Sequence, residues 1–178
     1  QRFEEEGIEL RPDPTSLARY QFSNVRGGQA DKWRLRWRTP TGRFQTLAID
    51  ADDEKVLIAD GWGQRASKDP YTTLPFVIRR RDAGAGTLES RYLSLYEGYR
   101  NEPLVKEVRT LQLAGERVEG AEGTVAVAVT AGAHTDYLLH GVHASSVSAD
   151  TEHGELLFQG RAGAASLQSS GLDILGVI

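Results

Sequence analysis

Residues 32–38 read Lys32-Trp33-Arg34-Leu35-Arg36-Trp37-Arg38 and alternate between basic and apolar side chains without a break. Successive side chains of an extended strand point to opposite faces, so this stretch predicts a strand with one apolar and one cationic face. The apolar face, formed by Trp33, Leu35 and Trp37, requires a hydrophobic core. Like charges along a strand repel each other, so the cationic face requires anions from this chain or from a partner.

The same alternation recurs along the rest of the chain. Turn residues interrupt it about every 8–12 residues, which is the spacing of a sandwich or barrel. No window of about eleven residues keeps an apolar repeat of helical period. The pattern predicts an all-β fold, an antiparallel β-sandwich of about ten or more strands. The predicted strands are 32–38, 43–49, 54–59, 74–81, 90–99, 104–113, 124–130, 135–139, 154–159 and 164–167.

The length and composition are those of a folded domain. The chain has 178 residues, of which 39% are hydrophobic and 26% charged, enough apolar material for a buried core. Residues 1–19 are acidic and contain prolines, so we interpret them as a linker or N-terminal extension. Residues 20–178 are predicted to form the β-sandwich domain. Met is absent, even at position 1, and residues 172–178 are mostly apolar, so we expect a fragment of a longer polypeptide.

Several classes of function are disfavoured by the same numbers. The formal net charge of -4 gives no general case for nucleic-acid binding. The chain has no cysteine, which excludes disulfides and thiolate metal sites. No run of about 18 apolar residues is present, so no membrane span is predicted.

Four segments in order carry a resemblance to a known family. They are Asn24-Val25-Arg26-Gly27-Gly28, Leu74-Pro75-Phe76-Val77-Ile78-Arg79-Arg80-Arg81, the run from Ser90 to Val108, and Thr135-Asp136-Tyr137-Leu138-Leu139-His140. Together with the strand at 32–38, they resemble the C-terminal β-rich region of heparinase II/III-like polysaccharide lyases. The resemblance covers roughly residues 20–140. Gly98 departs from it, because the family more often has proline there.

The resemblance implies a parent protein with a catalytic helical toroid followed by β-sandwich domains. Such lyases cleave acidic, uronate-containing polysaccharides by β-elimination, and the resemblance implies a secreted or periplasmic location. The toroid supplies most of the catalytic groups, and no segment of this chain matches them. The resemblance therefore implies no catalytic residue here.

Candidate glycan-binding residues come from the basic strands and from the loops. Guanidinium groups bind carboxylates and sulfates with two hydrogen bonds, and arginines two apart on a strand are spaced about 6.6–6.8 Å. Exposed aromatic rings in loops can stack on sugars. The alternatives are pairing of the arginines with carboxylates on neighbouring strands, docking on the toroid, and packing of the aromatics. The candidates are Arg34, Arg36, Arg38, Trp62, Tyr71, Arg79 and Arg81.

Two other clusters are weaker candidates. His134 and His140 face opposite to Tyr137 and His143 on one strand, so they do not converge on a single substrate atom or metal. The acidic run at 50–54, with Asp60, offers oxygen ligands for a structural Ca²⁺, but it has no EF-hand pattern. No catalytic residue, metal ligand or cofactor is assigned; a solvated acidic loop is the alternative to calcium.

The leading hypothesis is a non-catalytic accessory β-sandwich domain of a heparinase II/III-like lyase. It supports the catalytic toroid and helps to hold acidic polysaccharide. The alternative is a purely structural scaffold between domains, with no glycan binding. A third hypothesis is a lyase that is active on its own.

Overall fold

The computed structural model describes residues 3–51, 53–63, 73–88, 90–114, 123–168 and 171–177. These residues form antiparallel β-sheets and contain no helix, which confirms the predicted all-β antiparallel fold. The chain divides into two compact units, Gln1–Arg100 and Asn101–Ile178. The β-sandwich domain predicted for residues 20–178 spans parts of both units.

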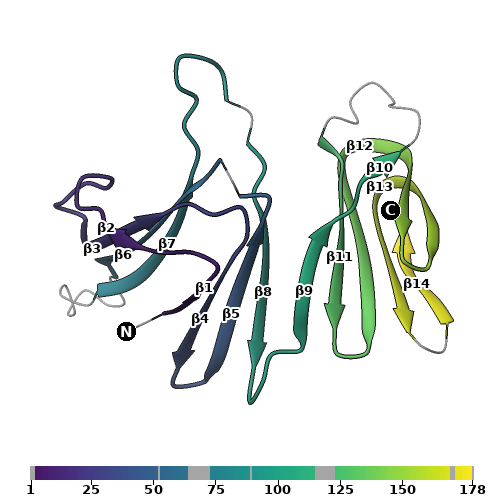
Figure 1. Ribbon diagram of the computed structural model, residues 1–178, viewed down its shortest axis with the longest axis horizontal. Helices are drawn as coiled ribbons and strands as arrows, with labels where there is room; N and C mark the ends of the chain where they lie inside the picture. Colours follow the sequence, from purple (N-terminus) through teal and green to yellow (C-terminus); the bar gives the residue numbers. More distant parts are fainter. Residues whose placement is uncertain are drawn as a thin grey trace. The chain divides into compact units, whose positions relative to one another are not determined.

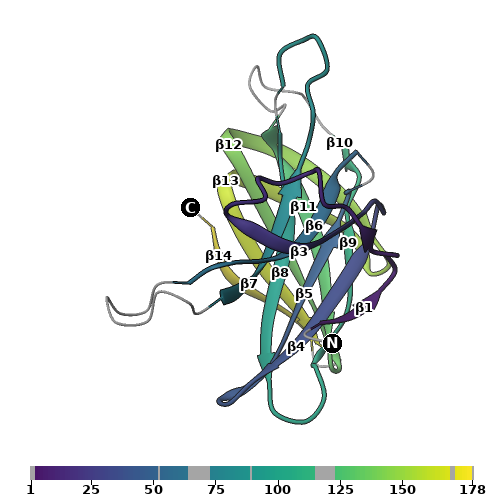
Figure 2. The same cartoon turned by 90° about the vertical axis from the view of Figure 1, so that its left-hand side faces the viewer.

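The N-terminal unit consists of two four-stranded sheets (Figures 1 and 2). Sheet A has the order β1-β4-β5-β8 and sheet B the order β2-β3-β6-β7. The sheet A strands are β1 (Glu4–Glu6), β4 (Trp33–Thr39), β5 (Gly42–Ile49) and β8 (Leu93–Tyr99). The sheet B strands are β2 (Arg11–Pro12), β3 (Phe22–Gly28), β6 (Lys55–Trp62) and β7 (Thr73–Arg80). Figure 1 shows the two sheets diverging from the corner between β5 and β6.

Residues 33–38 of the alternating basic and apolar stretch belong to the strand β4. It pairs with β5 in a hairpin that turns at residues 39–42. Residues 1–19, expected to be a linker, also contribute two strands to the sheets. In β1, Glu4 lies opposite Arg36 and Glu6 opposite Arg34, whereas β2 pairs with β3.

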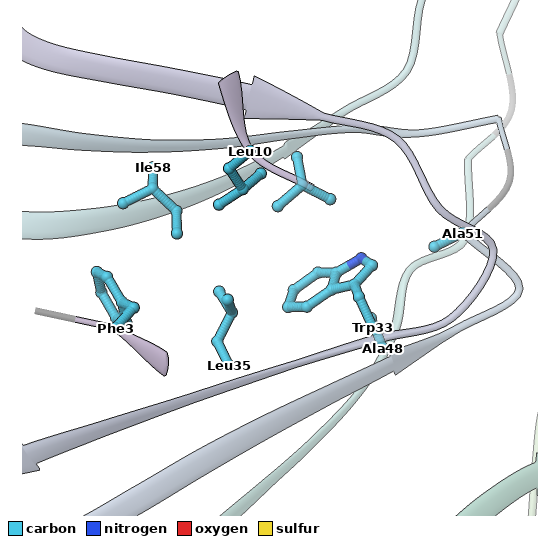
Figure 3. Packing of buried hydrophobic residues seen from close by; sticks show 8 residues of the cluster. Phe3, Leu10, Trp33, Leu35, Ala48, Ala51 and Ile58 are labelled. Carbon is cyan, nitrogen blue, oxygen red and sulfur yellow. The ribbon is translucent and has the colours of Figure 1, made fainter. Parts of the chain in front are cut away.

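The space between the sheets holds the main core of this unit (Figure 3). Trp33 and Leu35 of β4 are 3% and 0% exposed, which confirms that the apolar face of residues 32–38 enters a core. Trp37 packs against the same core and is partly buried. Sheet B contributes Val56 and Ile58. The cluster is completed by Phe3, Leu10, Ala48 and Ala51.

Strand β6 is buried on both faces because the segment before β3 covers its other side. Leu57 and Ala59 form a second small core with Val25, against which Leu17 and Phe22 pack. Burial on both faces explains why the sequence of β6 is a continuous apolar run and does not alternate between apolar and polar residues.

The C-terminal unit is one antiparallel sheet of order β14-β13-β12-β11-β9, with β10 also paired to β12. Its strands are β9 (Val105–Thr110), β10 (Leu113–Ala114), β11 (Val125–Ala131), β12 (His134–Thr151), β13 (Gly154–Gln168) and β14 (Gly171–Val177). Strands β12 and β13 are longer than the predicted segments because a register shift between His140 and Ser145 lets the pairing continue. Tyr137, Leu139, Val147 and Phe158 are among the buried residues of its core.

Within the described ranges, no helix has the length and apolar character needed to cross a membrane.

Candidate functional site

The face of sheet A that points away from the Trp33 and Leu35 core carries the arginines of β4, and one carboxylate of β1 joins two of them. Arg34 Nη1 lies 3.2 Å from one oxygen of Glu6, and Arg36 Nη1 lies 3.0 Å from the other. Because β1 pairs with β4, the chain places Glu6 directly beside these cations. The positive charge of Arg34 and Arg36 is therefore offset in part by the protein itself.

The next row of side chains on this face is polar, and two of its members are joined by a hydrogen bond. Arg36, Gln45 and Glu97 lie opposite one another on β4, β5 and β8. Gln45 has no exposed surface, and its amide nitrogen donates a hydrogen bond of 2.6 Å to Glu97. Glu97 thus has a partner on its own sheet.

The last row of the same face brings two cations together beside an aromatic ring. Arg38 pairs in register with Arg43, and Arg43 pairs with Tyr99. Arg38 is exposed and makes no hydrogen bond or ion pair with a described residue, whereas Arg43 is partly buried and has a partner. Directly opposed like charges destabilise a sheet unless an anion lies nearby. We define Arg38, Arg43 and Tyr99 as the arginine row.

Arg79 has an internal role that the sequence did not reveal. It faces the interior of the unit from β7, and two of its nitrogens lie 2.5 and 2.7 Å from the two oxygens of Glu54. A third nitrogen donates to the Leu93 carbonyl and the Ser94 hydroxyl at the start of β8. Arg79 therefore joins sheet B to sheet A.

Arg81 meets the same carboxylate. Its Nη2 lies 2.9 Å from Glu54 and 3.0 Å from Asp53, and it donates to the Asp50 carbonyl. The ring of Tyr92 lies 5.2 Å from both guanidinium carbons, a cation–π arrangement. The side chains of Arg79 and Arg81 are only 10% and 12% exposed, so both are used within the fold and do not form part of an open glycan surface.

The two aromatic candidates for sugar stacking are Trp62 and Tyr71, and the structure describes one of them. Trp62 ends β6 and is 76% exposed, in keeping with a residue that is free to contact a ligand. Its neighbour Gly61 is tightly enclosed, because a Cβ there would lie 2.6 Å from the Phe76 ring. Tyr71 lies outside the described residues.

The histidines and the acidic turn do not form a site among the described residues. Along β12, Tyr137 is buried in the core and His140 is exposed, so they occupy opposite faces as predicted. His134 lies 3.6 Å from Asp136, a neighbour on its own strand. No group of three or more His, Asp or Glu side chains in the described ranges is arranged to hold a metal ion.

Sequence reasoning missed Arg43 and Tyr99, the two neighbours of Arg38. The signal was available in part: a hairpin turning at residues 39–42 places Arg43 opposite Arg38. Tyr99 required the pairing of β5 with β8, which are separated by two strands of the other sheet. Alternation alone does not reveal such long-range pairing.

Comparison with models of protein families finds no match to this chain. A search of curated proteins also finds no relative.

Proposed function

We propose that this chain is a non-catalytic β-sandwich module that binds acidic polysaccharide. The proposal extends the resemblance to the C-terminal region of heparinase II/III-like lyases, in which the module would accompany a catalytic toroid. The supporting observation is the register pairing of Arg38 with Arg43. Arg38 is exposed and has no partner among the described residues, so its guanidinium group is open to a carboxylate or sulfate beside a second cation.

The surroundings of the arginine row favour a sugar acid as the anion. Tyr99 continues the row on β8 and adds an aromatic side chain beside the two cations. An aromatic ring packs against the apolar face of a pyranose, while the guanidinium groups bind its carboxylate. Glu6 forms ion pairs with Arg34 and Arg36. The arginine of β4 whose charge has no such partner is therefore Arg38.

Affinity electrophoresis of the whole chain through gels containing polygalacturonate, alginate or heparin tests the proposal. We expect at least one of these polymers to retard the protein, and we expect added salt to abolish the retardation. Arg38→Glu should weaken binding by at least about tenfold, because it replaces a cation of the site with an anion.

Arg19→Glu is the matched control, because Arg19 is an exposed arginine of the same unit outside the row. It changes the net charge by the same amount and should leave retardation almost intact. Equal losses in the two variants would show a general charge effect and contradict a site at Arg38. If no uronate or sulfated polymer retards the protein, the binding function is refuted and the scaffold role is favoured. An ultraviolet assay for unsaturated uronate product should show no product, since the module is proposed to lack catalytic groups.

A further inference from the structure

The positive charge on the face of sheet A that carries the arginine row is unevenly distributed. The arginine row itself brings together two cations, Arg38 and Arg43. The next row along the strands holds one cation and one anion, because Arg36 lies on β4 and Glu97 on β8. The sign of the charge therefore becomes mixed within one step along β4.

The carboxylate of Glu6 holds the two remaining arginines of β4. Arg34 Nη1 lies 3.2 and 3.3 Å from its two oxygens, and Arg36 Nη1 lies 3.0 Å from one of them. The register of β1 against β4 fixes this position, since Glu6 lies directly opposite Arg34. A carboxylate placed here occupies the same guanidinium groups that a carboxylate or sulfate of a ligand would bind.

The direction of a bound acidic chain follows from this distribution of charge. Arginines two apart on a strand are spaced about 6.6–6.8 Å, so β4 taken alone offers a cationic track along the strand. In the folded unit, a polyanion that follows this track from Arg38 passes the carboxylates of Glu97 and Glu6. Like charges brought together cost free energy and select against such a ligand. A chain that lies across the strands, from Arg38 to Tyr99, meets two cations and an aromatic ring instead.

We propose that Glu6 is a specificity-determining residue, which confines the cationic site to one row and makes it select polymers with sparse charge. The role of Glu6 rests on the proposed binding of acidic polysaccharide at the arginine row. A polyuronate carries one carboxylate per sugar, which suits a row of two cations. A densely sulfated polymer carries several anionic groups per disaccharide and brings more of them against Glu6 and Glu97.

The variant Glu6→Gln of the whole chain tests the role of this carboxylate. In affinity electrophoresis at low salt, polygalacturonate should retard the wild type more than heparin does. Removing the charge of Glu6 takes away the anion that Arg34 and Arg36 share, and it extends the cationic face along β4. Binding of heparin should then strengthen by about tenfold, while binding of polygalacturonate should change by less than about threefold. Added salt should reverse the gain, because the gain comes from ion pairs.

Two further variants sharpen the test. Glu9→Gln is the matched control, because it removes the same charge from a residue of the same unit that is 74% exposed and pairs with Arg11. It should leave the preference unchanged. Arg36→Gln should cancel the gain of the Glu6→Gln protein but have little effect alone. The side chain of Glu6 is 55% exposed, so its ion pairs add little stability and every variant should keep a midpoint of thermal unfolding near that of the wild type.

The outcomes separate the role of Glu6 from the proposed function. If no acidic polymer retards the wild type, the binding function is refuted and the role of Glu6 with it. If polygalacturonate retards the wild type but Glu6→Gln keeps the same preference, the role of Glu6 alone is overturned. It is also overturned if heparin retards the wild type more strongly than polygalacturonate does. An equal gain in Glu9→Gln would show a general effect of net charge and overturn it as well.

Discussion

Glu54 carries a fully buried charge in the N-terminal unit. Its carboxylate has no exposed surface and contacts both Arg79 and Arg81. A buried charge is tolerated only when it is paired, and removing one member leaves the others uncompensated. The sequence showed Glu54 only as part of an acidic turn and the arginines only as cations on a strand. Their proximity depends on the antiparallel pairing of β6 with β7, which brings Arg79 opposite Val56.

Replacing Glu54 with Gln should therefore strongly destabilise the folded state. We expect Glu54→Gln to lower the free energy of unfolding by about 3–5 kcal/mol, because two nearly buried guanidinium groups lose their counter-charge. Urea denaturation followed by tryptophan fluorescence measures the change. Glu9→Gln is the matched control, since Glu9 also forms a bidentate pair with an arginine, Arg11, but in full exposure. Its unfolding midpoint should hardly move, and similar midpoints for the two variants would refute the role given to Glu54.

Asp13 gives the stability of this unit a dependence on acid pH. Hydrogen bonds from Lys55 and Ser16 lower the pKa of Asp13 below its ordinary value. A carboxyl whose pKa is lower in the folded state stabilises the fold above its unfolded pKa and loses that effect as pH falls through the folded value. Asp13→Asn should therefore be less stable than the wild type near neutral pH. The difference should shrink below about pH 4, where the unfolded group starts to protonate. Urea midpoints measured across this range would contradict the prediction if the difference stayed constant.

At the scale of the elements, the β4–β5 hairpin was predictable and the edge strands were not. The hairpin follows from local alternation and a local turn, both visible in residues 32–49. The strand β1 consists of three glutamates, which have little tendency to form strands by themselves. It forms beside β4, where Glu6 lies between two arginines, so its existence depends on a distant neighbour.

Strand packing in sheet B depends on one glycine. Gly61 lies opposite Phe22 of β3, and the rings of Phe22 and Phe76 contact each other edge to face at 5.6 Å. A Cβ at position 61 would lie 2.6 Å from one ring and 2.9 Å from the other. We expect Gly61→Ala to cost about 1–3 kcal/mol of stability, because both rings must shift. Gly42→Ala is the control: the nearest atom to its added Cβ is 3.9 Å away, so its urea midpoint should be nearly unchanged. An equally small effect at Gly61 would show that the rings yield easily.

At the scale of the whole molecule, the sequence predicted the class of fold but not its division into two units. Alternation shows which face of a strand is buried, but it does not show which sheet the strand joins. Strands β4 and β5 belong to sheet A, β6 and β7 to sheet B, and β8 to sheet A again. The same limit explains the candidate site: Arg38 was found from its own strand, whereas Tyr99 depends on the return of the chain to sheet A.

The division into units makes a prediction of its own. Both sheets of the N-terminal unit, with all their described pairings, lie within residues 1–100. We expect a chain of these 100 residues to fold by itself, since it contains its own hydrophobic core. It has no disulfides to form, and none of its described strands pairs with the sheet of the C-terminal unit. Dispersed amide resonances in an NMR spectrum and a cooperative thermal transition would confirm this. A collapsed spectrum would show that the unit depends on residues 101–178.

The ion cluster at Glu54 also links the two sheets of the N-terminal unit at one end. It lies where β5 passes to β6, and Arg79 of β7 also donates hydrogen bonds to Leu93 and Ser94 at the start of β8. The edge strands β7 and β8 belong to different sheets, so this contact holds them to each other without any shared backbone pairing. Breaking it would free one edge strand from the other while both sheets stay paired, and the stiffness of one buried carboxylate would set how far the two sheets move as one body.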